Sequence, residues 1–179
     1  MDRSIVILVD EEDKSLGTAE KMEAHLNGEL HRAFSIFIFN GEGDLLLQRR
    51  AMEKYHSGGL WTNTCCSHPI TDMSLEGFAR LRLQEEMGFD TPLYKVFDFV
   101  YKADMENGLI EHEFDHVLVG TYSGPVYPDP AEVMEYKFLS PEQIGDSLEK
   151  FPHMYTAWFR MAFPRVKKWQ QHHSGEQEE

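Results

Sequence analysis

Four strand-like runs constrain what this chain can fold into more than any other feature of its sequence. They are rich in aromatic and branched side chains and cover residues 30–39, 44–49, 93–102 and 109–122. Asn40-Gly41-Glu42-Gly43 separates the first two runs, and the turn-like residues 103–108 separate the others. Short connections of this kind are typical of β-hairpins. The sequence therefore predicts two hairpins, with shorter strands at 4–9 and 136–139.

One helix is predicted between the two hairpins. Ser74 fits an N-cap, Gly88 fits the C′ position, and apolar side chains recur between them at helical spacing. Arg82 and Glu86 are four residues apart and would share a helix face, where a surface salt bridge is the commoner outcome. Ser140-Pro141-Glu142 predicts the start of another helix, because proline is favoured at the first helical position.

The remaining segments carry weaker signals. Those that fit exposed connections or loops cover residues 19–25, 54–60 and 123–130. The final amphipathic stretch, residues 154–169, should be kinked or interrupted at Pro164, because proline cannot continue the helical hydrogen bonds. The polar residues 170–179 are expected to fray.

The run Trp61-Thr62-Asn63-Thr64-Cys65-Cys66-Ser67-His68-Pro69 places a thiol and an imidazole two residues apart. Side chains alternate with period two in a strand, so Cys66 and His68 would leave the same face. That face could offer a nucleophile or acid/base group beside a metal ligand. The alternative is ordinary packing, since a cysteine in an apolar segment is usually a small buried hydrophobe.

A row of carboxylates marks the strand predicted at 109–122. Glu111, Glu113 and Asp115 alternate onto one face of that strand. Like charges at this spacing repel each other, so the row is either fully solvated or neutralised by a cation. A solvated face is the commoner of the two arrangements.

Composition narrows the class of protein. The chain has 179 residues, of which 41% are hydrophobic, which is enough for one domain with a sizeable core. Its formal net charge of −14 argues against nucleic-acid binding and against an anionic membrane surface. A phosphate-bearing ligand would therefore have to be held by a few local cations or by metal. Cys65 and Cys66 are adjacent and cannot supply a disulfide framework, and with no signal peptide or membrane span in the sequence we expect the cytoplasm.

Taken together and in order, these features resemble type I isopentenyl diphosphate isomerase. The residues that carry the resemblance are His25, His31, the run 61–69, Glu85-Glu86-Met87-Gly88, Tyr101, Glu111-His112-Glu113 and Trp158. The resemblance extends from about Ile5 to Trp158, and its most specific part is Thr-Asn-Thr-Cys-Cys-Ser-His-Pro followed some 45 residues later by Glu-x-Glu. That family is a divergent branch of the Nudix fold. The resemblance thus implies one α/β (α+β) domain over residues 1–179, with a mixed β-sheet sandwiched between helices.

The Nudix box, the motif that gives the fold its name, is eroded in this chain. Ser67 stands where the box has glycine, Met73 where it has glutamate, and Leu81-Arg82 where it has Arg-Glu. The residues that remain are Glu85, Glu86 and Gly88. Nudix hydrolases gather metal ions with the helix carboxylates, so this loss weakens the interpretation as a hydrolase of a nucleoside or prenyl diphosphate. The isomerases show the same erosion.

Carried over residue by residue, the resemblance implies two metal sites and a diphosphate site. The first metal site consists of His25, His31, His68, Glu111 and Glu113. That ligand set suits Mn²⁺ or Mg²⁺, and Zn²⁺ would tolerate it. A second ion, Mg²⁺, is implied at Glu86 and the backbone of Cys66, where it would bridge the substrate diphosphate. The basic residues implied around the diphosphate are Lys21, Arg50, Lys54 and Arg82, with Arg49 a weaker candidate.

The implied reaction converts isopentenyl diphosphate into dimethylallyl diphosphate by adding a proton to an unactivated alkene and removing another. Cys66 and Glu113 are the implied acid/base pair, Tyr101 is the partner of Glu113, and Trp158 would stabilise a carbocation. Neighbouring cations or metal would lower the pKa of the Cys66 thiol from about 8.5 into working range. Cys65 is expected to pack in the core, facing away from Cys66.

Some alternatives remain open from sequence. A Nudix-type hydrolase would release phosphate, and a catalytically silent Nudix-like binding module would hold metal without turnover. The order in which Cys66 and Glu113 act is not determined, and the loop Tyr55-His56-Ser57-Gly58-Gly59 lacks the Pro-Gly step common in the family. No flavin signature is present, which excludes the flavin-dependent isomerases. We expect a small prenyl diphosphate as the partner, with no nucleic acid or membrane, and a monomer or weak homodimer.

Overall fold

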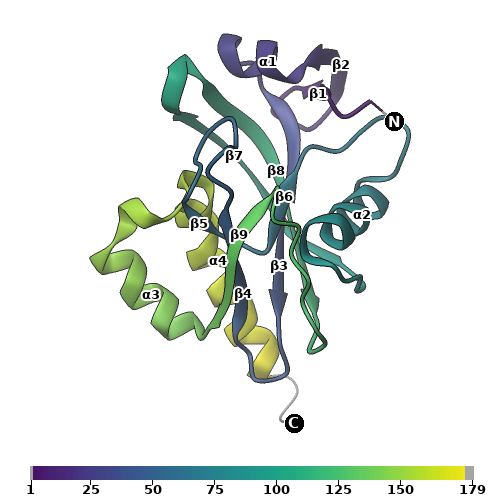
Figure 1. The fold of residues 1–179 in the computed structure, drawn as a ribbon. Helices are drawn as coiled ribbons and strands as arrows, with labels where there is room; N and C mark the ends of the chain where they lie inside the picture. The colour runs from purple at the N-terminus through teal and green to yellow at the C-terminus, as the bar shows by residue number, and fades with distance from the viewer. Residues whose placement is uncertain (1, 176–179) are drawn as a thin grey trace.

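The computed structural model describes residues 2–175 (Figure 1). The strands are β1 (Ile5–Val9), β2 (Ser15–Glu20), β3 (His31–Phe39), β4 (Leu45–Arg50), β5 (Trp61–Thr62), β6 (Cys65–Ser67), β7 (Tyr94–Asp104), β8 (Ile110–Thr121) and β9 (Val133–Leu139). The α-helices are α1 (Lys21–Asn27), α2 (Leu75–Met87), α3 (Pro141–Lys150) and α4 (Ala157–Gly175), with short 3-10 turns at Glu106–Gly108 and Pro152–Met154. Within the described residues, none of the helices is both long and apolar enough to cross a membrane.

The sheet is mixed, and β3 lies at its centre. The main path runs β2-β1-β3-β4-β5, while β8 pairs with β3 and β7, β6 pairs with β3, and β9 pairs with β4. The β3–β8 pairing is parallel and the other pairings are antiparallel. The predicted hairpin of β7 and β8 is confirmed, with pairs from Tyr94–Val119 to Asp104–Ile110. The predicted hairpin of β3 and β4 is correct only at its turn, because the two strands pair only at Phe39–Leu45.

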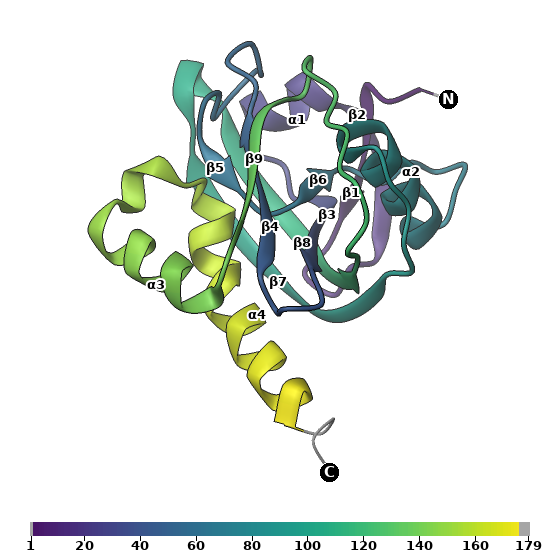
Figure 2. The ribbon, with the colours of Figure 1, turned by 60° about the horizontal axis from the view of Figure 1, so that its bottom comes forward.

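Alternating side chains of β3 enter two separate cores. Phe34, Ile36 and Ile38 pack with Phe78, Leu83 and Met87 of α2 on one face of the sheet. Phe37 and Phe39 pack with Phe159 and Phe163 of α4 on the other face. Burying each such side chain contributes about 1.5–3 kcal/mol, so the alternation anchors helices to both faces. Figures 1 and 2 show α2 on one side of the sheet and α3 and α4 on the other, as expected for a sheet sandwiched between helices.

Local capping fixes the helix ends that the sequence predicts. The Ser74 hydroxyl accepts from Gly77 N at 3.1 Å, and Gly88 ends α2 with φ +79°. Ser140 and Gln143 form a reciprocal capping box at the start of α3, with bonds of 2.9 and 3.2 Å. Each such cap satisfies backbone groups that helix ends otherwise leave unpaired.

One expectation about local structure is wrong, and another is wrong in part. Residues 19–25 are not an exposed connection, because β2 runs directly into α1, where Glu20 accepts from Glu23 N at 2.9 Å as the N-cap. Pro164 does not interrupt α4, which continues to Gly175. Phe163 and Val166 are buried on either side of the proline, so packing holds the helix together there. The segment expected to fray is helical as far as Gly175, and residues 176–179 lie outside the described part of the chain.

Candidate active site and metal centre

The candidate metal site, which we call the metal cluster, consists of His25, His31, His68, Glu111 and Glu113 and lies where α1, β3, β6 and β8 meet. In the parallel register of β3 and β8, His31 lies directly opposite Glu113, and Glu111 shares its face of β8. His68 follows β6, which pairs with the other edge of β3, and His25 comes from α1. All of these residues except the half-buried His68 are almost fully buried. Elements from three separate regions of the sequence therefore converge on one point.

The five side chains converge as the resemblance implies. One ligand atom from each of His25, His31, His68, Glu111 and Glu113 lies within 4.8 Å of all the others. The His68 and His31 Nε2 atoms lie 3.0 and 3.5 Å from Glu113 Oε1, and the His25 Nε2 atom lies 3.6 Å from Glu111 Oε1. This convergence is the arrangement that a metal centre requires.

The outer hydrogen bonds aim the imidazoles inward. His25 Nδ1–H donates to Lys21 O at 2.6 Å and His31 Nδ1–H donates to Glu29 O at 2.8 Å, which leaves both Nε2 atoms pointing into the cluster. Among the described residues, neither Nε2 atom has a hydrogen-bond partner, and Glu111 Oε2 has none either. Buried polar atoms are rarely left unpaired without a reason. Three imidazoles and two carboxylates with such atoms fit a divalent metal ion.

The carboxylates on β8 differ in their electrostatics. Burial opposes ionisation of Glu113, but its interactions with Glu111, His31 and His68 outweigh burial and hold the pKa of Glu113 well below its usual range. Asp115 lies two residues further along the same face, where burial raises its pKa well above normal and Ser35 Oγ donates to it at 2.7 Å. The pKa values of these two neighbouring carboxyl groups are therefore shifted in opposite directions.

The implied acid/base pair shares one small cavity. Cys66, Glu113, Tyr101 and Trp158 all line a space of about 30 Å³, and the Tyr101 hydroxyl donates to Glu113 Oε2 at 2.9 Å. Such a space admits one or two water molecules and no five-carbon chain. The walls of this cavity must therefore separate when a substrate tail of that size enters.

One expectation about Cys66 is wrong for the ligand-free protein. Burial raises the pKa of its thiol to about 12, and the nearby Arg50 charge only partly counteracts burial. The thiol therefore keeps its proton at neutral pH. Cys65 is buried in the core beneath α2, as expected.

The amide side chain of Asn63 holds the residues before Cys66 in place. Its Nδ2 donates to Ile36 O at 3.1 Å and to Cys65 O at 2.9 Å, which ties the run to β3. Its Oδ1 accepts from Trp158 Nε1 at 3.1 Å and lies 3.8 Å from the Cys66 sulfur. One buried side chain thus sets the position of both the thiol and the indole relative to the sheet.

His56 is a site residue that the sequence did not reveal. It lies in the predicted loop at 54–60 but is 1% exposed, and its Nε2 contacts Glu111 Oε1. Its Nδ1 lies 3.0 Å from Ser57 Oγ, and its ring meets the Trp158 ring edge-on at 5.8 Å. A histidine in a Gly-rich loop carries no periodic signal, so nothing local predicted its burial.

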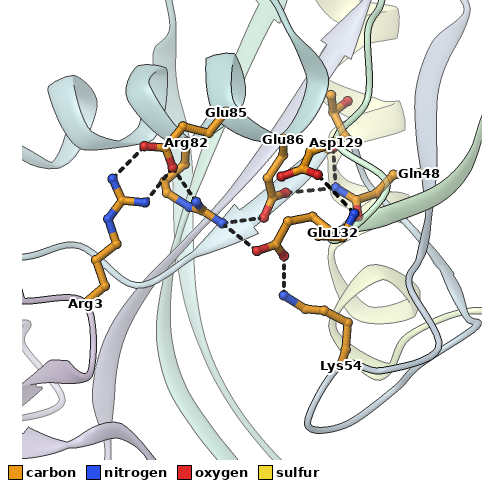
Figure 3. Close-up of polar contacts among 10 residues, drawn as sticks. Arg3, Gln48, Lys54, Arg82, Glu85, Glu86, Asp129 and Glu132 are labelled. Carbon is orange, nitrogen blue, oxygen red and sulfur yellow. Dashed lines mark hydrogen bonds and ion pairs between the residues drawn. The ribbon is translucent and has the colours of Figure 1, made fainter.

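A wider pocket of about 230 Å³ adjoins the cavity and shares Arg50, Cys66 and His68 with it. The four basic residues implied for a diphosphate all line this pocket, and we call Lys21, Arg50, Lys54 and Arg82 the cation pocket. Arg82 donates to Glu86 Oε1 at 2.7 Å, and Gln48 donates to Glu86 Oε2 at 3.1 Å (Figure 3). Arg49 is instead paired with Glu135 at 2.9 Å, outside the residues that line this pocket.

Comparison with known proteins places this fold in a class. A family model described as NUDIX domain matches residues 29–159. The DR0079 structure from Deinococcus radiodurans has a TM-score of 0.72 at 15% identity, covering 90% of this chain and 98% of that one. The MutT protein structure from Methanosarcina mazei Go1 has a TM-score of 0.63 at 21% identity, covering 78% and 94%. At these identities the likeness shows the fold alone, and that fold is the Nudix fold.

Curated sequences define the family more narrowly. Isopentenyl-diphosphate Delta-isomerase 2 of Photorhabdus laumondii is 45% identical over 171 residues, covering 93% of this chain and 97% of the relative. The isopentenyl-diphosphate Delta-isomerase of Pectobacterium atrosepticum is 46% identical, covering 96% of this chain and 96% of the relative. That of Burkholderia multivorans is 48% identical, covering 92% of this chain and 96% of the relative. The chain belongs to the isopentenyl-diphosphate Delta-isomerase family.

Proposed function

We propose that this protein isomerises isopentenyl diphosphate to dimethylallyl diphosphate by protonation and deprotonation. The observation that carries the proposal is that Cys66 and Glu113 line one small cavity, with the His/Glu cluster at one end and the cation pocket beside it. The membership of the chain in the family supports the same conclusion. A cavity of this kind can exclude water from a reaction that water would divert.

The cluster of His25, His31, His68, Glu111 and Glu113 would hold Mn²⁺, with Mg²⁺ or Zn²⁺ as alternatives. When bound, that ion supplies positive charge beside Glu113 and acidifies its hydrogen-bonded partners. Mg²⁺ that arrives with the diphosphate would be held by Glu86 and the backbone of Cys66. Glu86 is 4% exposed and faces the cation pocket, which supports this assignment.

The protein side chains would carry the two proton transfers. An alkene is a poor base, so the donor must be fixed in place and the site must be dry. Cys66 has a protonated thiol and Glu113 is bonded to the Tyr101 hydroxyl, so each can exchange one proton with a flat substrate held between them. The Trp158 indole would stabilise the intermediate carbocation by about 0.5–2 kcal/mol through its ring face.

The cation pocket would position the substrate through its non-reacting end. Lys21, Arg50, Lys54 and Arg82 bind the diphosphate, which holds the small apolar tail against the reacting groups. This local cluster explains how a chain of net charge −14 can bind an anion. Glu85, the other acidic remnant of the box, is bonded to Arg3 and Arg82 and does not line the pocket, which disfavours a hydrolase.

The test is incubation with isopentenyl diphosphate and Mg²⁺ in heavy water, followed by mass and NMR analysis of the product. We expect dimethylallyl diphosphate that contains deuterium, and no release of phosphate or diphosphate. Cys66→Ala should abolish labelling while Mn²⁺ binding persists. Unlabelled product would contradict proton exchange, and phosphate release without isomerisation would identify a hydrolase instead.

A further inference from the structure

A carboxylate already occupies the cation pocket. Glu132 Oε2 lies 2.5 Å from Lys54 Nζ, and Glu132 Oε1 lies 3.6 Å from an Arg82 guanidinium nitrogen. Figure 3 shows the Glu132 side chain between Lys54 and Arg82. Among the residues that line this pocket, Glu132 and Glu86 are the acidic ones. Glu86 is shared between Arg82 and Gln48, whereas Glu132 bridges two of the cations.

The backbone on either side of Glu132 is held firmly. Asp129 N donates to Glu86 O at 2.9 Å, and Tyr127 N donates to Met87 O at 2.9 Å, which ties the segment to the end of α2. Glu132 O accepts from Ala51 N at 3.0 Å, which ties it to the end of β4. The backbone of Glu132 is therefore fixed in place. Release of its carboxylate from the cations requires only rotation of the side chain.

The electrostatics agree with an anion in this position. Burial disfavours the charge of Glu132, but the hydrogen bond from Lys54 and the charges of Lys54, Arg82 and Arg50 outweigh it and lower its pKa. The Glu132 charge also acts on Lys21. Burial and the charge of Lys54 lower the pKa of Lys21, and the negative charge of Glu132 partly offsets that decrease. All members of the cation pocket are thus in the field of one carboxylate.

We propose that Glu132 is an internal counter-ion that holds the cation pocket between turnovers and is displaced from Lys54 and Arg82 by the diphosphate. This proposal rests on the proposed function, since it takes the cation pocket as the diphosphate site. Clustered cations repel one another when no anion is present, and a tethered carboxylate removes that repulsion without a ligand. Because a ligand must first displace Glu132 from Lys54 and Arg82, every ligand that carries the diphosphate binds more weakly than it would to a pocket without this carboxylate.

Weaker binding of this kind serves an isomerase. Substrate and product have the same diphosphate, so the cation pocket binds both equally, and uniform binding does not accelerate the chemical step. A pocket with no counter-ion would retain the product, and product release limits many enzymes. The return of Glu132 to Lys54 and Arg82 assists that release.

The test measures inorganic diphosphate binding with Mg²⁺ by calorimetry in four proteins. Glu132→Gln should bind at least threefold more tightly than the unaltered protein, with lower KM and lower kcat for isopentenyl diphosphate. Glu135→Gln is the matched control, because Glu135 pairs with Arg49 outside the pocket lining and should leave binding unchanged. Lys21→Gln removes a pocket cation without removing a partner of Glu132 and should weaken binding.

The outcomes separate the two proposals. If Lys21→Gln weakens binding but Glu132→Gln leaves it unchanged, the counter-ion is refuted and the diphosphate site stands. If Glu132→Gln weakens Mg²⁺-dependent binding, Glu132 is instead a ligand of the diphosphate-bound ion, and the counter-ion is likewise refuted. If Lys21→Gln has no effect, the cation pocket is not the diphosphate site and both proposals fail. Circular dichroism and thermal midpoints of each variant confirm that it is folded.

Discussion

Among single residues, His56 links the metal cluster to the aromatic wall of the cavity. Its Nε2 contacts Glu111 Oε1, while Glu111 Oε2 remains without a hydrogen-bond partner among the described residues. His56 therefore fixes one carboxylate oxygen and leaves the other for an ion. Its ring also meets that of Trp158 edge-on, so His56 contacts both Glu111 and the aromatic wall of the cavity.

We predict that His56→Ala weakens Mn²⁺ binding about tenfold or more, because residues that orient metal ligands typically have effects of this size. Calorimetric titration of the chelator-stripped protein measures the affinity. His112→Ala is the control, since His112 lies on the opposite face of β8 and donates to Gly28 O. Equal affinity in the His56 and His112 variants would show that His56 does not orient Glu111.

The site residues were predictable to the extent that their signals were local. Period two in a strand was enough to pair Cys66 with His68 and to align Glu111 with Glu113. His25 came only from the family resemblance, because its short helix was mistaken for an exposed connection. His56 and Glu132 lie in irregular segments, where a side chain's direction depends on tertiary contacts and not on a repeating pattern.

At the scale of secondary-structure elements, the end of α2 positions both Glu86, which we propose as a Mg²⁺ ligand, and the segment that carries Glu132. Gly88 adopts φ +79°, and a Cβ built there would lie 2.5 Å from Tyr127 O. Tyr127 N in turn donates to Met87 O. Glycine at this position thus permits both the helix end and the close approach of the following loop.

We predict that Gly88→Ala lowers the free energy of unfolding by about 2 kcal/mol or more, from a disfavoured backbone conformation together with a steric clash. Gly108→Ala is the control, because Gly108 has φ +73° but a Cβ added to it would meet nothing within 4 Å, so only about 1 kcal/mol is expected. Urea unfolding measures both variants. Equal losses would show that the contact with Tyr127 is unimportant.

The secondary-structure elements also include some that local sequence predicts and others that it does not. The α2 helix and the β7–β8 hairpin were predictable, because caps, turns and periodicity are encoded within a few residues. The parallel pairing of β3 with β8 was not visible, since the partners are far apart in sequence and no turn joins them. The continuation of α4 through Pro164 depends on core packing that outweighs the local preference of proline.

At the scale of the whole molecule, the cluster of His25, His31, His68, Glu111 and Glu113 joins α1 and β3, near the start of the chain, to β8. It brings α1 against β8 and the end of β6 against both central strands. An ion bound there by the native state alone would stabilise the entire fold, because unfolding separates the ligands.

We predict that saturating Mn²⁺ raises the thermal midpoint of the chelator-stripped protein. At a Mn²⁺ concentration a hundredfold above Kd, the free energy of unfolding should increase by about 2.7 kcal/mol. Ca²⁺ should have a much smaller effect, because it prefers oxygen ligands to imidazole. His25→Asn should lose most of the Mn²⁺-dependent shift. A midpoint that does not respond to Mn²⁺ would contradict a folded-state metal site.

The paired strands β3 and β8 also limit how the length of this chain can vary in evolution. Their contact is unbroken from His31–Glu113 to Phe39–Thr121, so one added or deleted residue in either strand would turn every later side chain to the opposite face. Related proteins should therefore tolerate insertions in the turn at residues 40–44 but not within these two strands.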